Sequence, residues 1–210
     1  EMLSLEDDPA LMSAVLFSLI LAIQEKMYHS PRDLKKVAVI DEAWRLLGGS
    51  NKHAARFIET GYRTVRRHSG SFVTITQGIK DFTASREAEA AWNNSATKVT
   101  LLQDGKAFKS YLQDNPDQFP ELEKEVSRKF QKAADTGFSS LLITAGEYST
   151  FHRLFVDPVT RAMFSSRGTD FAFMQEAKKV GATSEEAAYL LAEKLYPQEL
   201  EELETWYTAE

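Results

Sequence analysis

Three side chains that can take part in phosphate chemistry follow two strand-like stretches of the sequence. Asp41 and Glu42 come directly after the apolar run 37–40, and Gln77 follows the β-branched run 71–76. In open α/β sheets, ligands bind beyond the carboxyl ends of the strands. A carboxylate there can hold Mg²⁺ or take a proton from water, and an amide can hydrogen-bond a γ-phosphate or the attacking water. The two strand ends together predict a magnesium-phosphate site.

The elements that must position these side chains form the order strand, helix, strand between residues 37 and 76. This is the order of a βαβ unit in a parallel sheet. The run 37–40 is expected to be a strand buried on both faces. An apolar strand that ends in Asp-Glu has the form of a Walker B strand. The alternatives are a core strand that ends in two solvated acids and, for Gln77, a turn residue that bonds to the backbone.

A basic helix connects the two strands. It is expected to begin at Ser50 or Asn51, after the loop 48–50, and to end near His68, with an apolar face on one side and arginines on the other. Arg63, Arg66 and Arg67 are candidates for an arginine finger that reaches a nucleotide in a neighbouring subunit, an effect worth roughly 10³ to 10⁵ in rate. The alternative is a solvated face with surface ion pairs, such as Glu59 with Arg63 at i,i+4.

The charge is unevenly distributed along the 210 residues. Ten acidic and three basic side chains lie in residues 169–210, a net charge of −7, so residues 1–168 carry +1 of the total of −6. This near-neutral body gives no support for strong nucleic-acid binding. The chain has no cysteine, which excludes disulfides and thiolate metal sites, and its four scattered histidines predict no structural metal.

The remaining pattern predicts an α/β fold with a mainly parallel sheet flanked by helices. Residues 2–5 and 99–102 are expected to be strands, 86–93 and 117–132 helices, and 141–144, 150–156 and 160–164 a meander that adds an antiparallel edge. Residues 1–167 form the main domain. Residues 168–210 form a helical tail on that domain, with a capping box that begins at Thr183 and an apolar stripe, Leu200, Leu203, Trp206 and Tyr207.

An apolar helix is expected over residues 10–23, after an Asp8-Pro9 start signal. A transmembrane helix needs about 20 apolar residues. This run is shorter, so we expect a helix packed on the sheet.

A phosphate-binding loop of the form G-x-x-x-x-G-K-[ST] does not occur in the sequence. The only Gly-Lys pair is Gly105-Lys106, which Ala107 follows. The chain begins at Glu1 without an initiator Met or a signal peptide. We therefore expect a piece of a longer polypeptide that starts downstream of the phosphate-binding loop.

The stretches VAVIDEAWRLL, FIETGYRTVRRHSG and FVTITQ, in this order and spacing, closely resemble the C-terminal motor domain of TraC-like conjugative type IV secretion ATPases. The resemblance covers about residues 1–167 and implies a partial RecA-like P-loop fold of the HerA/FtsK type. It implies that Asp41 is the Mg²⁺ ligand, that Glu42 is the catalytic base and that Gln77 contacts the γ-phosphate. Arg66 and Arg67, then Arg63, are the implied finger residues.

The same resemblance implies ATP and Mg²⁺ as cofactors and self-association, commonly as a hexamer. It also implies inner-membrane secretion components as partners at the cytoplasmic face of the bacterial inner membrane, and a role in pilus assembly and substrate transfer. Without a phosphate-binding loop, the 210 residues alone are expected to be inactive. Two alternatives stay open: a DNA-translocating ATPase of the same superfamily, and a non-enzymatic docking module that uses the C-terminal helices.

Overall fold

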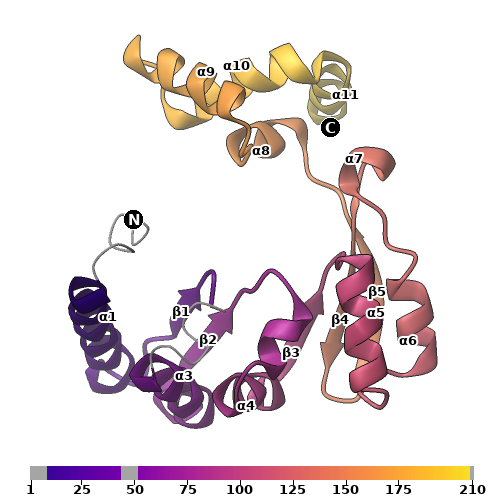
Figure 1. The fold of residues 1–210 in the computed structure, drawn as a ribbon. Helices are drawn as coiled ribbons and strands as arrows, with labels where there is room; N and C mark the ends of the chain where they lie inside the picture. Colours follow the sequence, from indigo (N-terminus) through magenta and orange to yellow (C-terminus); the bar gives the residue numbers. More distant parts are fainter. Residues whose placement is uncertain (1–8, 44–51, 209–210) are drawn as a thin grey trace. The chain divides into compact units, whose positions relative to one another are not determined.

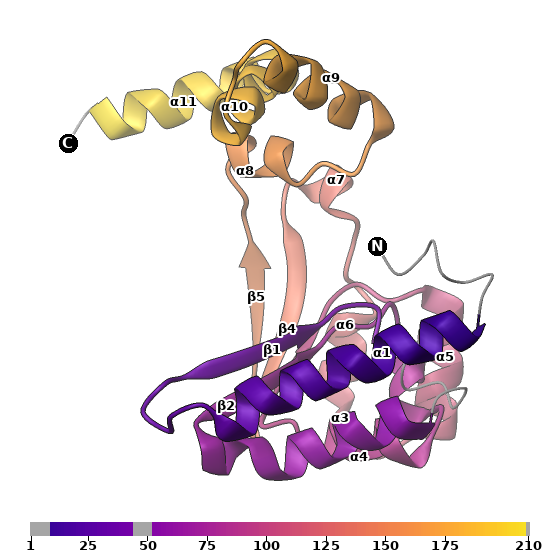
Figure 2. The ribbon, with the colours of Figure 1, turned by 90° about the vertical axis from the view of Figure 1, so that its left-hand side faces the viewer.

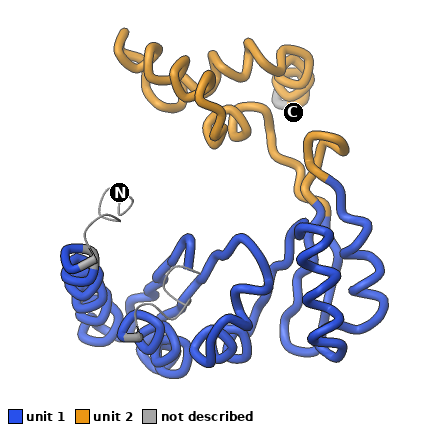
Figure 3. Tube along the Cα trace, viewed as in Figure 1, with its two compact units in different colours: residues 1–131, 140–152 blue, residues 132–139, 153–210 orange. Residues whose placement is uncertain are grey.

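The computed structural model describes residues 9–43 and 52–208 (Figure 1). The predicted strand 2–5 and loop 48–50 lie outside this part. The chain divides into two compact units, residues 1–131 with 140–152, and residues 132–139 with 153–210 (Figure 3). The predicted division into residues 1–167 and 168–210 stays a prediction.

The first unit holds most of the sheet structure. In chain order its elements are α1 (Pro9–Gln24), η2 (Glu25–His29), β1 (Lys36–Ile40), α3 (Lys52–Thr64), η3 (Val65–His68), β2 (Gly70–Thr74), η4 (Ile79–Thr83), α4 (Arg86–Asn94), β3 (Thr97–Thr100), α5 (Gly105–Asp114), α6 (Glu121–Ser127) and most of β4 (Ser139–Ala145) and β5 (Tyr148–Leu154). None of the described helices is long and apolar enough to cross a membrane.

A parallel pair of strands, β1 and β2, forms the βαβ unit that the sequence predicts. Val37 lies opposite Ser71, and Ile40 lies opposite Thr74. The crossover contains α3 and η3, and the apolar face predicted for the connecting helix is buried at Phe57 and Ile58 of α3 and at Val65 of η3. The mixed α/β class is confirmed.

One face of this sheet is covered and the other is exposed. Leu16 of α1 and Ile58 of α3 share an apolar core with Phe72 of β2, and the two helices lie side by side on that face (Figure 2). On the opposite face Val37 and Val39 are each 63% exposed. The prediction that this strand is buried on both faces is therefore wrong for this chain, because no described element covers the second face.

The antiparallel part of the fold is a separate three-stranded sheet in the order β3-β4-β5. The predicted strand 99–102 forms as β3, two residues earlier, and it pairs antiparallel with β4. Among the described residues it does not pair with β2. The predicted strand 160–164 is wrong. These residues belong to α8 (Pro158–Met163), because Asp157 accepts a hydrogen bond from the Thr160 backbone N–H at 2.9 Å and Pro158 occupies the first turn.

The helix predicted at residues 117–132 forms only in part, as α6 (Glu121–Ser127). The segment 105–114 forms a helix that was not predicted, α5, in which Asp104 caps the start by accepting from the N–H groups of Lys106 and Ala107. The next helix, α6, begins only after Pro120, since proline suits a helix start and not its interior. The helix predicted at residues 86–93 forms as α4.

The second unit is helical. It contains α7 (Ala133–Thr136), α8, α9 (Gly168–Lys179), α10 (Ser184–Leu195) and α11 (Pro197–Thr208). The predicted capping box is present: the Glu186 N–H donates to the Thr183 hydroxyl, and the Thr183 N–H donates to the Glu186 carboxylate. Of the predicted stripe, Leu200 is buried, whereas Trp206 is 61% exposed. The side chain of Tyr207 lies outside the described part.

We expect Gly70→Ala to destabilise the first unit by about 1–3 kcal/mol, because an added Cβ would lie 2.4 Å from Val65 Cγ2 and 2.9 Å from Met27 Cε, both in buried side chains. Urea unfolding measures the change. The matched control is Gly105→Ala, where a Cβ meets no atom within 4 Å. Equal unfolding midpoints for the two variants would show that η3 and β2 do not pack this closely.

Candidate active site at the strand ends

Two of the predicted site residues are in direct contact. The Gln77 side-chain Nε2 donates to both carboxylate oxygens of Glu42, at 3.1 Å each. Asp41 lies beside them, and its Oδ1 accepts from the Glu42 backbone N–H at 2.9 Å. The fold therefore brings together two acids and an amide that are 35 residues apart in sequence. Their chemical roles stay predictions.

Glu42 reaches Gln77 because the backbone bulges at this position. Beyond β2, the Ile75 N–H bonds the Ile40 carbonyl, and the Ile75 carbonyl accepts from the Ala43 N–H, both at 2.9 Å. In a regular parallel ladder these two partners are two residues apart; here they are three apart. Glu42 is the extra residue, and its φ is +52°. Bulges of this kind redirect a side chain beside a functional site.

The positive φ of Glu42 is a strained conformation for a residue with a side chain. Ala43 is fully buried and bonds the Ile75 carbonyl, so the chain must turn sharply within one residue to return to the ladder. Such strain is retained where the surrounding structure enforces it, and it is concentrated at functional sites. The bulge is thus a second observation, independent of residue type, that marks this strand end.

The loop that carries Gln77 is held from both sides. The Gly78 N–H donates to Asp81 Oδ2 at 3.2 Å, and the Ile79 N–H donates to the side-chain Oε1 of Gln103 at 2.9 Å. Gln103 follows β3, as Gln77 follows β2. A pocket of about 380 Å³ lies between these two loops, lined by Gln77, Gly78, Ile79, Lys80, Asp81, Gln103, Asp104, Ala107 and Phe108. Gln103 is not among the predicted site residues, although a polar residue directly after the run 99–102 is the same signal as Gln77 after the run 71–76.

The arginines lie at the other end of β2. Arg66 and Arg67 are exposed in η3, which precedes β2, whereas Gln77 follows it. Five strand residues at about 3.3 Å each separate the two ends by roughly 16 Å. Arg63 pairs with Glu59 at 3.0 Å, the surface ion pair of the alternative interpretation. Within one chain, the structure does not bring these arginines to Asp41, Glu42 and Gln77.

The acids at the strand end fit a magnesium ion that arrives with phosphate. The described residues contain no group of three or more His, Asp or Glu that could hold a metal alone. Mg²⁺ is usually held by one or two carboxylates together with substrate phosphates and water. Asp41, with support from Glu42, matches that donor set.

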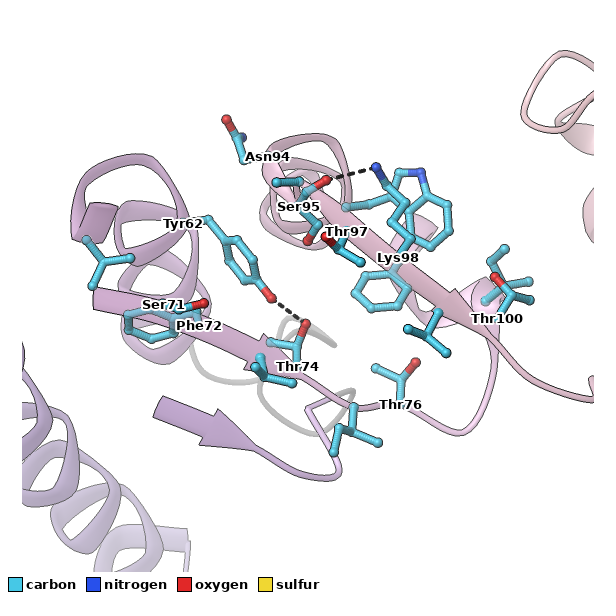
Figure 4. Close-up of a pocket in the computed structure, with 18 of the residues that line it drawn as sticks. Tyr62, Ser71, Phe72, Thr74, Thr76, Asn94, Ser95, Thr97, Lys98 and Thr100 are labelled. Atoms are coloured by element: carbon cyan, nitrogen blue, oxygen red, sulfur yellow. Dashed lines mark hydrogen bonds between the residues drawn. The ribbon is translucent and has the colours of Figure 1, made fainter. Parts of the chain in front are cut away.

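A larger groove of about 820 Å³ runs between β2 and β3 (Figure 4). Lys98 lies on its wall, where its ammonium donates to the Ser95 carbonyl at 3.0 Å and lies 5.3 Å from the centre of the Trp92 ring. Partial burial lowers the pKa of Lys98. This groove could not be predicted from the sequence, since it depends on which strands pair.

The sequence of residues 1–192 matches the model of the TraG P-loop domain. The chain belongs to this family. It is 50% identical to Protein TraC of Escherichia coli (strain K12) over 209 residues, which are 98% of this chain and 24% of TraC. The TraC-like identity predicted from the sequence is confirmed.

The fold of this chain is similar to that of a solved structure, VirB4 of Thermoanaerobacter pseudethanolicus. The TM-score is 0.58 at 21% identity, over 74% of this chain and 40% of the VirB4 chain. The chain thus spans about a quarter of the length of TraC and less than half of the VirB4 chain.

We expect Glu42→Gly to be more stable than Glu42→Ala by about 1 kcal/mol, because both variants lose the carboxylate and only glycine relieves the positive φ. Urea unfolding of the two variants measures the difference. The matched controls are Glu125→Gly and Glu125→Ala, inside α6. Here the alanine variant should be the more stable of the two, since glycine is disfavoured within a helix. If alanine is the more stable residue at both positions, residue 42 does not adopt the left-handed conformation.

Proposed function

We propose that this chain is part of the ATP-hydrolysing motor of a conjugative type IV secretion system, which powers pilus assembly and the transfer of substrate and DNA. The contact between Glu42 and Gln77 at two neighbouring strand ends carries the proposal. Membership of the TraG P-loop domain family and the similarity to TraC support it. The exposed Asp41 beside this pair adds the acid that a magnesium-bound nucleotide needs.

Asp41, Glu42 and Gln77 have different proposed roles in ATP hydrolysis. Asp41 would hold Mg²⁺, and bound Mg²⁺ supplies neutralisation of the phosphate charge. A Glu42 carboxylate oxygen accepts the proton of the attacking water. The Gln77 amide, which now donates to Glu42 at 3.1 Å, can hydrogen-bond the same water or the γ-phosphate and so positions one against the other. The contact between Gln77 and Glu42 keeps the two side chains close enough to act on the same water.

The 210 residues alone are proposed to be inactive, because their sequence has no G-x-x-x-x-G-K-[ST] stretch to supply the backbone amides and lysine that cradle phosphates. We propose that the longer polypeptide forms a hexamer at the cytoplasmic face of the bacterial inner membrane, with secretion components of that membrane as partners. Strong direct nucleic-acid binding by these residues is not proposed, since residues 1–168 carry a net charge of only +1. Mass photometry and membrane fractionation of the longer polypeptide test its assembly and location.

Glu42→Gln in the longer polypeptide should keep ATP binding and lower kcat by roughly 10²-fold or more, because the amide cannot accept the proton. Phosphate release measures kcat, and a fluorescent ATP analogue measures binding. The control Glu147→Gln removes an exposed carboxylate in the β4–β5 turn and should leave kcat unchanged. Full turnover in the Glu42→Gln protein would remove Glu42 from the proposed role.

Arg66 and Arg67 are proposed to act on the nucleotide of a neighbouring subunit, because they lie at the opposite end of β2 from their own chain's site. The double variant Arg66→Ala with Arg67→Ala should be as inactive as Glu42→Gln. When the two inactive proteins are mixed, some sites combine an intact Glu42 with a neighbour's intact arginines, so hydrolysis should recover. Mixed assemblies that form without any recovery would exclude action between subunits.

A further inference from the structure

Gln77 is held beside Glu42 by the backbone that carries it, since an exposed side chain has few packing contacts of its own. On the upstream side, the ladder fixes Ile75: its N–H donates to the Ile40 carbonyl, and its carbonyl accepts from the Ala43 N–H, both at 2.9 Å. Only one residue lies between Ile75 and Gln77. The position of Gln77 therefore depends on what holds the chain on its downstream side.

On the downstream side the chain is anchored at Ile79, two residues after Gln77. The side chain of Ile79 is buried in a core with Phe108 of α5 and Leu142 of β4. Its backbone N–H donates to the side-chain Oε1 of Gln103 at 2.9 Å. Apolar packing thus holds the side chain of Ile79, and Gln103 holds its backbone.

The bond between Ile79 and Gln103 joins two sheets that do not pair with each other. The strands β2 and β3 lie on the two sides of the 820 Å³ groove (Figure 4), and among the described residues no ladder connects them. The bond from the Gly78 N–H to Asp81 Oδ2 stays within one turn, so it shapes the turn without attaching it to another element. Gln103, 24 residues further along the chain, attaches the turn to the end of β3.

The Gln103 side chain is itself fixed at both ends of its amide. Its Nε2 donates to the Leu101 carbonyl at 3.2 Å, next to β3, while its Oε1 accepts from Ile79. A backbone N–H can only donate and a carbonyl can only accept, so one orientation of the amide satisfies both partners. Gln103 is also half-buried. It therefore forms a defined link rather than a loose surface contact.

We infer that Gln103 is a positioning residue for ATP hydrolysis: by holding the Ile79 backbone, it keeps the Gln77 amide where it can act on the attacking water or the γ-phosphate. It acts on the reaction only through Gln77, so this role rests on the proposed function. A displacement of about 1 Å in a positioning group can cost roughly 10²-fold in rate. Loss of the link should thus lower kcat and leave ATP binding intact.

The test uses Gln103→Met in the longer polypeptide, which keeps the length of the side chain and removes both hydrogen-bonding groups. We expect kcat to fall by at least about tenfold, with a change of less than about twofold in the Kd for a fluorescent ATP analogue. Gln103→Glu retains an acceptor for the Ile79 N–H and should keep a higher kcat than Gln103→Met. The matched control Gln113→Met, exposed near the end of α5, should leave kcat unchanged.

A double variant separates positioning of Gln77 from general support of the fold. In a Gln77→Ala background, Gln103→Met should lower kcat no further, because the effects of residues that act as a unit are not additive. An equal loss of kcat in both backgrounds would show that Gln103 acts in another way and would overturn the inference. An unchanged kcat in the single variant Gln103→Met would overturn it as well.

Hydrogen exchange without nucleotide tests the link apart from hydrolysis. In Gln103→Met the Ile79 amide should exchange at least about tenfold faster, whereas the Ile75 amide, which bonds Ile40, should keep its rate. An unchanged rate at Ile79 would overturn the inference. If Gln103→Met is too unstable to purify, Gln103→Asn, whose shorter side chain draws the amide away from Ile79, is measured with the same expectations.

Failure of the proposed function gives a different result. If Gln77→Ala alone keeps full kcat, the role proposed for Gln77 is wrong, and with it the contribution of Gln103 to hydrolysis. The exchange rate of the Ile79 amide then still shows whether Gln103 holds the turn, since that measurement requires neither ATP nor turnover.

Discussion

The bulge in the parallel ladder between β1 and β2 is the constraint on which the candidate site depends. The backbone of Ile75 holds both Ile40 and Ala43, and burial of Ala43 keeps the chain against the sheet. Glu42, between them, is forced into a left-handed conformation and toward Gln77. Backbone hydrogen bonds and the buried Ala43 thus set the backbone position from which the Glu42 carboxylate reaches Gln77.

Close packing beneath this ladder keeps the two strand ends together. At Gly61 an added Cβ would lie 2.8 Å from the Phe72 ring, so the absence of a side chain lets α3 approach β2 closely. Phe57 and Tyr62 also contact that ring. On this side α1 and α3 cover the two strands, whereas on the opposite side Val37, Val39 and Val73 are exposed. An apolar face of this kind is usual where another part of a protein packs.

The two ends of β2 have different chemistry. The carboxyl end carries an acid and an amide that contact each other, and the amino end follows the exposed Arg66 and Arg67. A single chain therefore carries acidic side chains and an amide where β1 and β2 end, and a basic pair just before β2 begins. In the proposed assembly of several chains, the acidic end of one chain would meet the basic pair of a neighbouring chain.

The sequence by itself determined the local features of this protein. The residues that follow the runs 37–40 and 71–76, the buried face of α3 and the capping box at Thr183 each depend on a few neighbouring residues, so periodicity and residue type were sufficient. Local signals were insufficient at residues 160–164, which are predicted as a strand, although Asp157 as N-cap and Pro158 in the first turn begin α8. The segment 105–114 was missed, although Asp104 caps it in the same way.

The tertiary structure alone decided what depends on pairing across the chain. Residue type predicts an acid, Glu42, after one strand and an amide, Gln77, after another. The bulge at Glu42 is what brings the Gln77 Nε2 to 3.1 Å from the Glu42 carboxylate oxygens. Likewise, the sequence of β3 predicts a strand without saying that β4, and not β2, is its partner. Alternation of side chains specifies which residues form a strand, whereas strand order is set by contacts between distant segments. For that reason the groove between β2 and β3 could not be predicted from the sequence.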